Sequence, residues 1–79
     1  MTKQAKLGKI LLTLNAHNFI NRELISLALI KHLGTVGDER NKNRKAISRH
    51  IDLDGAIFYI ITESDRSKTV IYLNHEVNI

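Results

Sequence analysis

The first apolar run of the chain follows the period of an α-helix. Its members recur at i, i+3, i+4 and i+7: Leu7, Ile10, Leu11 and Leu14. This spacing places them along one side of a helix, so it predicts an amphipathic helix over residues 3–15. The polar stretch from Asn15 to Asn18 is expected to form a turn.

A second helix is expected to begin near Asn21, because an asparagine side chain can cap the first backbone N–H groups. Gly34 is placed to end it. Its apolar residues lie nearly all round the helix, which predicts a position at the centre of a small core: Leu24, Ile25, Leu27, Ala28, Leu29, Ile30 and Leu33.

Residues 34–43 are polar and glycine-bearing, which is typical of a loop. From Arg44 to about Leu53, apolar residues again recur on one side and predict a third helix, with Asp38 or Asn43 as its N-cap. This inward side holds Ala46, Ile47, His50, Ile51 and Leu53, and the opposite side holds Lys45, Ser48, Arg49 and Asp52. The outward side is therefore short, basic and able to form hydrogen bonds.

Beyond Gly55 the period changes to two, which indicates β-structure. Residues 56–62 and 69–73 are rich in β-branched and aromatic residues, and the polar residues 63–68 separate them. These segments predict a β-hairpin. Both strands are apolar on both faces, and one layer of helices covers only one face, so we expect the uncovered face to bind a second copy or another partner.

A chain of 79 residues is expected to form a single domain, residues 1–79, of limited stability. Dimerisation is the expected stabilisation, because the sequence contains no cysteine and therefore no disulfide or zinc–cysteine site. Its 43% hydrophobic residues suffice for a core. No apolar run approaches the length of a membrane span, so a cytoplasmic protein that does not contact membrane is expected.

The net charge of +4 is unevenly distributed. Residues 1–22 contain four Lys and Arg and no acid, and residues 23–49 contain six bases and three acids. Residues 50–79 contain two bases and five acids. A polyanion would therefore approach the N-terminal two-thirds of the chain.

The predicted order of three helices and a hairpin resembles the winged helix-turn-helix family of DNA-binding domains. The resemblance is carried mainly by residues 43–61, which look like the family's recognition helix followed by the first strand of its wing. It implies an α+β fold, a third helix in the major groove of duplex DNA, and a wing on the DNA backbone. A homodimeric transcription regulator is the expected function.

The residues of the predicted DNA-binding site lie in the third helix, the loop before it and the wing. They are Arg40, Asn41, Lys42, Asn43, Arg44, Lys45, Ser48, Arg49, Arg66 and Lys68. Lys45 and Arg49 are the expected base contacts, whereas the other arginines and lysines before position 45 suit phosphates. In the wing, Glu63 and Asp65 offset the two bases.

The sequence offers little for other chemistries. His50, Asp52 and Asp54 share one side only if their segment is extended, and three ligands do not complete a metal site. Residues 34–37 are too short for a phosphate-binding loop and lack its lysine. We therefore expect no catalysis, no metal, no cofactor and no small-molecule effector.

The main alternative is a protein-interaction module, for example a phage or plasmid protein that binds and blocks a host protein. The apolar outer face of the hairpin would serve such a role. Binding would then depend on hairpin residues such as Tyr59 and Tyr72, whereas DNA binding would depend on salt and on Arg49.

Overall fold

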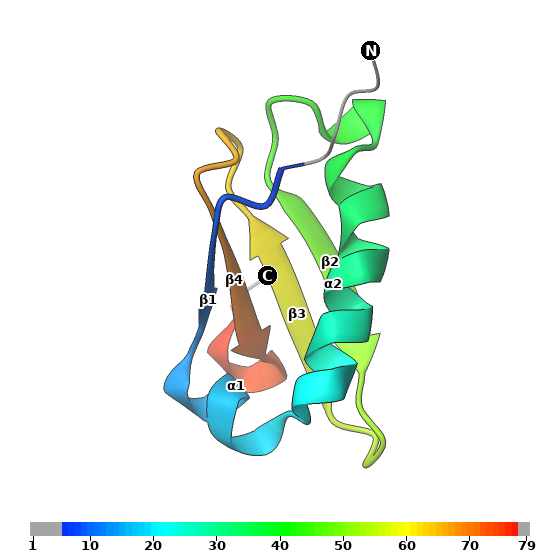
Figure 1. Ribbon diagram of the computed structural model, residues 1–79, viewed down its shortest axis with the longest axis vertical. Coiled ribbons are helices and arrows are strands. Elements are labelled where there is room, and N and C mark those ends of the chain that lie inside the picture. Colours follow the sequence, from blue (N-terminus) through cyan, green and yellow to red (C-terminus); the bar gives the residue numbers. More distant parts are fainter. Residues whose placement is uncertain (1–5, 78–79) are drawn as a thin grey trace.

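A computed structural model describes residues 6–77 and shows a four-stranded sheet with one long helix across one of its faces (Figure 1). The strands are β1 (Lys9–Leu12), β2 (Ala46–Ile51), β3 (Ile57–Thr62) and β4 (Lys68–Leu73). The helices are α1 (Leu14–Phe19) and α2 (Arg22–Val36), and the 3-10 turns are η1 (Glu39–Asn41) and η2 (Asn74–Glu76). The fold is α+β, but the expected three helices followed by a hairpin are wrong.

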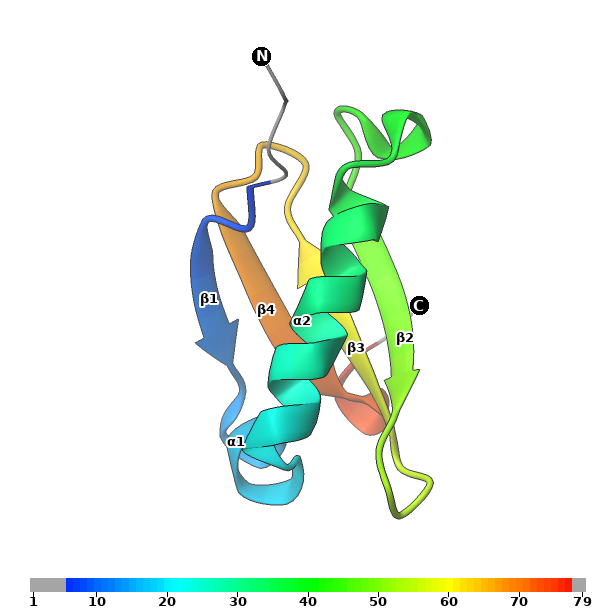
Figure 2. The same cartoon turned by 45° about the vertical axis from the view of Figure 1, so that its right-hand side comes forward.

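The strands lie in the order β1-β4-β3-β2. β2, β3 and β4 form an antiparallel meander, whereas β1 pairs parallel to β4. Figure 2 shows α2 crossing in front of the sheet, with β1 at one edge and β2 at the other. The predicted β3–β4 hairpin is confirmed, with its connecting loop at residues 63–67.

The second predicted helix is confirmed as α2. The Asn21 side chain accepts a hydrogen bond from the Glu23 N–H at 2.8 Å, as expected of the N-cap. The helix continues through Gly34, and Gly37 is its C-cap instead. The expected central position is wrong, because α2 covers the sheet from one side only and leaves Leu27 and Ile30 57% and 64% exposed.

The helix predicted over residues 3–15 is wrong for the residues that the structure describes; residues 3–5 lie outside them. Gly8 has a φ of +63°, in the left-handed region, and Lys9–Leu12 forms β1 instead. A short solvated helix is marginal by itself, whereas pairing with β4 satisfies the backbone groups on one side of β1 and completes the pairing of β4. Helix α1 begins only after Thr13, whose hydroxyl accepts from the Ala16 N–H.

The third predicted helix is also wrong, because residues 46–51 form strand β2. Ala46 is buried while Ile47 is exposed, so burial alternates along the strand as β-structure requires. The sequence of residues 46–51 lacks the apolar alternation of a strand, because the positions that face inward include the polar residues Ser48 and His50. Neither proposed N-cap serves such a helix: Asp38 caps η1, and Asn43 has a φ of +63°. The segment behind the winged helix-turn-helix resemblance is therefore two strands.

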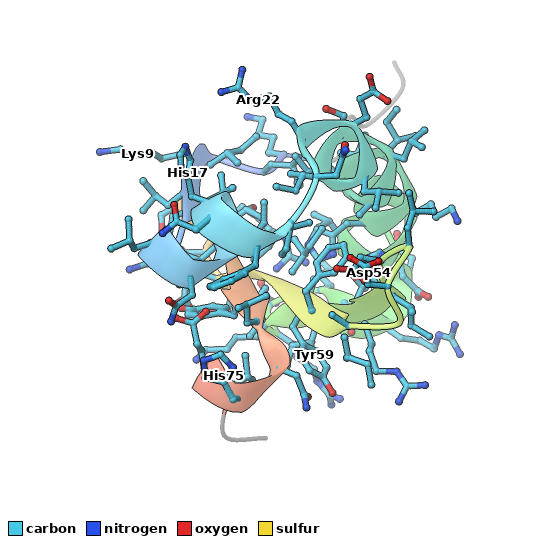
Figure 3. The ribbon with its side chains drawn as sticks, turned by 90° about the horizontal axis from the view of Figure 1, so that it is seen from below. Lys9, His17, Arg22, Asp54, Tyr59 and His75 are labelled. Carbon is cyan, nitrogen blue, oxygen red and sulfur yellow. The ribbon has the colours of Figure 1, made fainter. Side chains whose placement is uncertain are left out.

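The core lies between α2 and the sheet, and α1 closes its lower end. It is built from Ala16, Ile20, Ile25, Ala28, Phe58, Ile60, Ile71 and Leu73, with Leu12 and Leu29 packed against it. The opposite side of the sheet, here called the open face, presents Ile47, Arg49, Ile51, Ile57, Tyr59, Ile61, Val70, Tyr72 and Leu11. In Figure 3, Tyr59 points away from α2 on this side.

Candidate nucleic-acid interface

The topology gathers positive charge at one end of the molecule, which measures 39 Å along its longest axis. β1, β2 and β4 begin at this end, and β3 and α2 finish there (Figure 1). Among the described residues it holds eight bases, Lys6, Lys9, Arg40, Lys42, Arg44, Lys45, Arg66 and Lys68, and four acids, Asp38, Glu39, Glu63 and Asp65. We call it the basic end.

The opposite end is acidic. Its described charged residues are Arg22, Glu23, Asp52, Asp54 and Glu76. Figure 3 looks onto this end, with Asp54 in the β2–β3 turn and Arg22 at the start of α2. The uneven charge of the sequence therefore becomes a separation of charge along the long axis.

Eight of the ten predicted DNA-binding residues meet at the basic end, although the predicted helix is absent. They come from the α2–β2 connection and the β3–β4 hairpin: Arg40, Asn41, Lys42, Asn43, Arg44, Lys45, Arg66 and Lys68. Lys6 and Lys9 from the start of the chain join them. No pattern within 3–9 signals this, because it depends on the parallel pairing of β1 with β4.

The other two predicted residues lie elsewhere. Ser48 turns toward α2, where its hydroxyl lies 2.6 Å from Nδ1 of His32. Arg49 lies on the open face near the middle of β2, opposite Tyr59. The two side chains are on opposite faces of one strand, so they cannot form the single reading surface that a helix would give them.

Several charges at the basic end are paired within the protein. The Arg40 guanidinium donates to both carboxylate oxygens of Asp38, at 3.1 and 2.8 Å, and holds the pKa of that carboxyl down at about 2. Lys45 Nζ lies 3.9 Å from the Glu63 carboxylate. Both contacts are solvent-exposed and add little stability. They still reduce the positive charge available to a partner.

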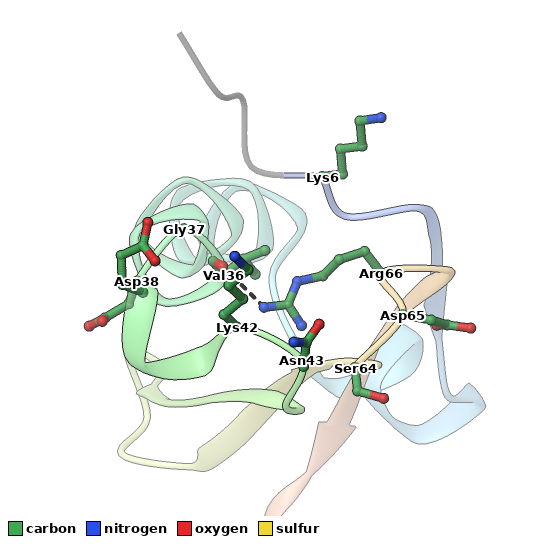
Figure 4. A pocket seen from close by; sticks show the side chains of 10 residues that line it. Lys6, Val36, Gly37, Asp38, Lys42, Asn43, Ser64, Asp65 and Arg66 are labelled. Atoms are coloured by element: carbon green, nitrogen blue, oxygen red, sulfur yellow. Dashed lines mark hydrogen bonds between the residues drawn. The ribbon is translucent and has the colours of Figure 1, made fainter.

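Arg66 joins the two loops of the basic end. Its guanidinium donates to four carbonyl oxygens: Arg44 at 2.6 Å, Asn41 at 2.9 Å, and Val36 and Glu63 at 3.2 Å each. Figure 4 shows the side chain reaching from the hairpin toward Val36. The wing contact predicted for Arg66 is untested, but both of its terminal nitrogens already donate to carbonyl oxygens within the protein.

A cavity of about 420 Å³ lies between these loops. Its charged lining is Lys6, Lys42, Arg66, Asp38, Glu39 and Asp65, three bases and three acids. The cavity is therefore not a dedicated anion pocket. The excess of positive charge lies on the surface around it, on Lys9, Arg44 and Lys68.

A chain of polar side chains crosses the protein beneath α2, and the sequence did not signal it. Its hydrogen bonds are His50 Nε2–Ser48 Oγ (2.7 Å), Ser48 Oγ–His32 Nδ1 (2.6 Å), His32 Nε2–Thr62 Oγ1 (2.8 Å), Thr62 Oγ1–Thr69 Oγ1 (2.7 Å) and Thr69 Oγ1–Leu7 O (2.6 Å). His32, Thr62 and Thr69 are completely buried. Burial, helped by the nearby His50 and Arg66, lowers the pKa of His32 to about 4. His32 is thus a neutral structural residue.

Two kinds of feature are not found in the described part of the chain: a cluster of metal ligands and a membrane-spanning helix. Within residues 6–77, no three His, Asp or Glu side chains are grouped as a metal site would require. In the same range, neither helix has the length and apolar character needed to cross a membrane.

No protein-family model matches the chain, and no curated protein or solved structure is significantly similar to it. The chemistry of the site therefore has to indicate the function by itself.

Proposed function

We infer that the protein binds the phosphate backbone of duplex DNA through its basic end. The observation that carries this proposal is the meeting of eight Lys and Arg from three separate segments, residues 6–9, 40–45 and 66–68. Cations grouped in this way attract a polyanion and release its counterions on binding. The acidic opposite end would orient the protein with this end toward the DNA.

Phosphate contacts dominate the proposed binding mode. Such contacts position a protein on DNA without distinguishing bases, and the basic end offers loops rather than a helix to the major groove. Arg44 and Lys68 are exposed, and neither forms an ion pair with an acidic residue in the described part of the chain. The proposed phosphate contacts are these two residues and three lysines, Lys6, Lys9 and Lys42.

The proposal predicts a steep dependence of DNA affinity on salt. If four phosphates are contacted, affinity for a mixed-sequence duplex falls roughly a hundredfold between about 50 and 200 mM salt. Fluorescence anisotropy of a labelled duplex measures this directly. An affinity that does not change with salt, or no binding at low salt, would contradict the proposal.

A matched pair of variants locates the contact. Arg44→Gln is expected to weaken binding several-fold, because one phosphate contact is lost. The slope of log affinity against log salt concentration, here the salt slope, should become shallower by about one. Arg22→Gln makes the same chemical change at the acidic end and should leave the slope unchanged. Equal effects of both variants would mean that net charge alone, and not the basic end, governs binding.

The open face is tested in the same titration. Tyr59 and Tyr72 are directly paired across β3 and β4, and Arg49 lies beside them. Bases of a single strand can stack on such aromatic side chains. Tyr59→Ala should leave duplex affinity unchanged; a large loss, together with a preference for single strands, would transfer the binding site to the open face.

A further inference from the structure

Strand β2 has an unpaired backbone edge. It is the last strand in the sheet order and pairs only with β3. The Asp52 N–H bonds the Ala56 carbonyl at 2.9 Å, and hydrogen-bonded pairs alternate along an antiparallel ladder. The backbone groups of Ile47, Arg49 and Ile51 therefore point away from β3. A six-residue edge of this kind is a template for another strand.

Apolar side chains flank this edge on both faces of the sheet. Ile47 and Ile51 are 42% and 61% exposed on the open face. On the other face a groove of about 520 Å³ separates β2 from α2, and its lining combines the apolar residues Leu24, Leu27, Ala28, Ile51 and Phe58 with Lys31, Arg49 and His50. A strand added to β2 would cover both sets of side chains.

Charge at the two ends of β2 points to a second copy as that strand. Arg44 and Lys45 precede it, and Asp52 and Asp54 follow it. An antiparallel pairing of two β2 strands places the basic start of each beside the acidic end of the other. A parallel pairing would place like charges together, which is destabilising.

We propose that β2 is a dimerisation strand: two copies pair their free β2 edges antiparallel about a two-fold axis and form one continuous sheet. The favoured register places the axis at Ser48, since this avoids setting Arg49 opposite itself. Arg44 then lies beside Asp52 of the second copy. The two α2 helices approach across the axis and bury Leu27, while the long side chain of Lys31 extends to solvent.

A proline at position 49 tests the backbone pairing. Its missing N–H is one that β3 does not use, so Arg49→Pro removes hydrogen bonds only from the free edge. Arg49→Ala is the matched control, which loses the same side chain but keeps the N–H. We expect sedimentation equilibrium from about 1 to 500 μM to show a dimer for the wild type and Arg49→Ala. Arg49→Pro should raise the dimer Kd about tenfold or more.

A second pair of variants does not depend on the fold tolerating proline. Leu27→Lys places a charge in the groove beside β2, and Ile30→Lys makes the same kind of change on the outer side of α2. Only Leu27→Lys should weaken the dimer, with both variants keeping the circular dichroism spectrum of the wild type. A wild type that stays monomeric at every concentration would overturn the proposal. So would a dimer that is equally sensitive to both lysines, or one that Arg49→Ala weakens as much as Arg49→Pro.

Discussion

The direction of every hydrogen bond in the buried polar chain follows from one carbonyl group. The Leu7 oxygen can only accept, so the single hydroxyl proton of Thr69 points to it. Thr62 must then donate to Thr69, and its oxygen must accept from Nε2 of His32. Neutral His32 therefore carries its proton on Nε2.

The same reasoning continues toward the protein surface. With its proton on Nε2, His32 accepts at Nδ1 from the Ser48 hydroxyl, and the Ser48 oxygen accepts from Nε2 of His50. Between the two ends of the chain, Ser48, His32, Thr62 and Thr69 each donate once and accept once. A nitrogen-detected NMR experiment on the histidines at neutral pH is expected to show the Nε2–H tautomer for His32; the other tautomer would exclude this network.

Protonation of His32 links folding to pH. The unfolded residue takes up a proton near pH 6.5 and the folded one only near pH 4, so the unfolded state binds more protons between these values. The free energy of unfolding should therefore fall by about 2–3 kcal/mol as pH drops through this window. Urea unfolding at several pH values measures it.

Two glutamine variants assign that pH dependence. His32→Gln should be less stable at pH 7 but lose most of the slope between about pH 6.5 and 4. His17→Gln, at an exposed position, should retain the slope of the wild type. A full slope in His32→Gln would mean that other groups cause the acid sensitivity; the depressed pKa of half-buried His50 acts in the same direction.

At the level of elements, the sequence predicted those whose apolar period was unambiguous. α2 and the β3–β4 hairpin are confirmed. β2 was misread because its inward positions include two polar residues: Ser48, which bonds His32, and His50, which bonds Ser48. A polar network that closes only in the folded protein leaves no periodic signal. Eight residues of the basic end were predicted as part of the DNA-binding site, but Lys6 and Lys9 were not, and the helix expected to carry most of that site does not exist.

β1 depends on a close approach at Gly8. A side chain there would overlap the Ser67 carbonyl oxygen, and the φ of +63° disfavours any L-residue with a side chain. Gly8→Ala is therefore expected to destabilise the protein by about 2–4 kcal/mol. Thermal or urea unfolding measures the loss.

Gly34 provides the comparison on α2. A Cβ there meets open space, and the residue is helical, so Gly34→Ala should stabilise the protein by about 0.5–1 kcal/mol. A loss of stability in Gly8→Ala together with a gain in Gly34→Ala would support the position of β1 in the structure. Similar, small effects would indicate that β1 is not docked in this way.

For the whole molecule, the arrangement of charge matters more than its sum. A net charge of +4 would suit many small proteins. Here the bases of residues 6–9, 40–45 and 66–68 share one end, while Glu23, Asp52, Asp54 and Glu76 share the other. The linear charge balance predicted that a polyanion would approach the N-terminal two-thirds. The predicted wing already placed Lys68 at the proposed site, but Lys6 and Lys9 were not predicted there, because only the parallel pairing of β1 with β4 brings them to that surface.

The parallel pairing of β1 with β4 also sets an order of events during folding. Lys9 lies opposite Lys68, so this pair of strands closes a loop of almost the whole described chain. The hairpins that join β2, β3 and β4 have short connections and can form much sooner, since chain closure costs more entropy over longer loops. During synthesis β1 emerges early but has no strand to pair with until β4 has left the ribosome. Pulse-labelled hydrogen exchange should accordingly find the amides of β1 among the last to be protected.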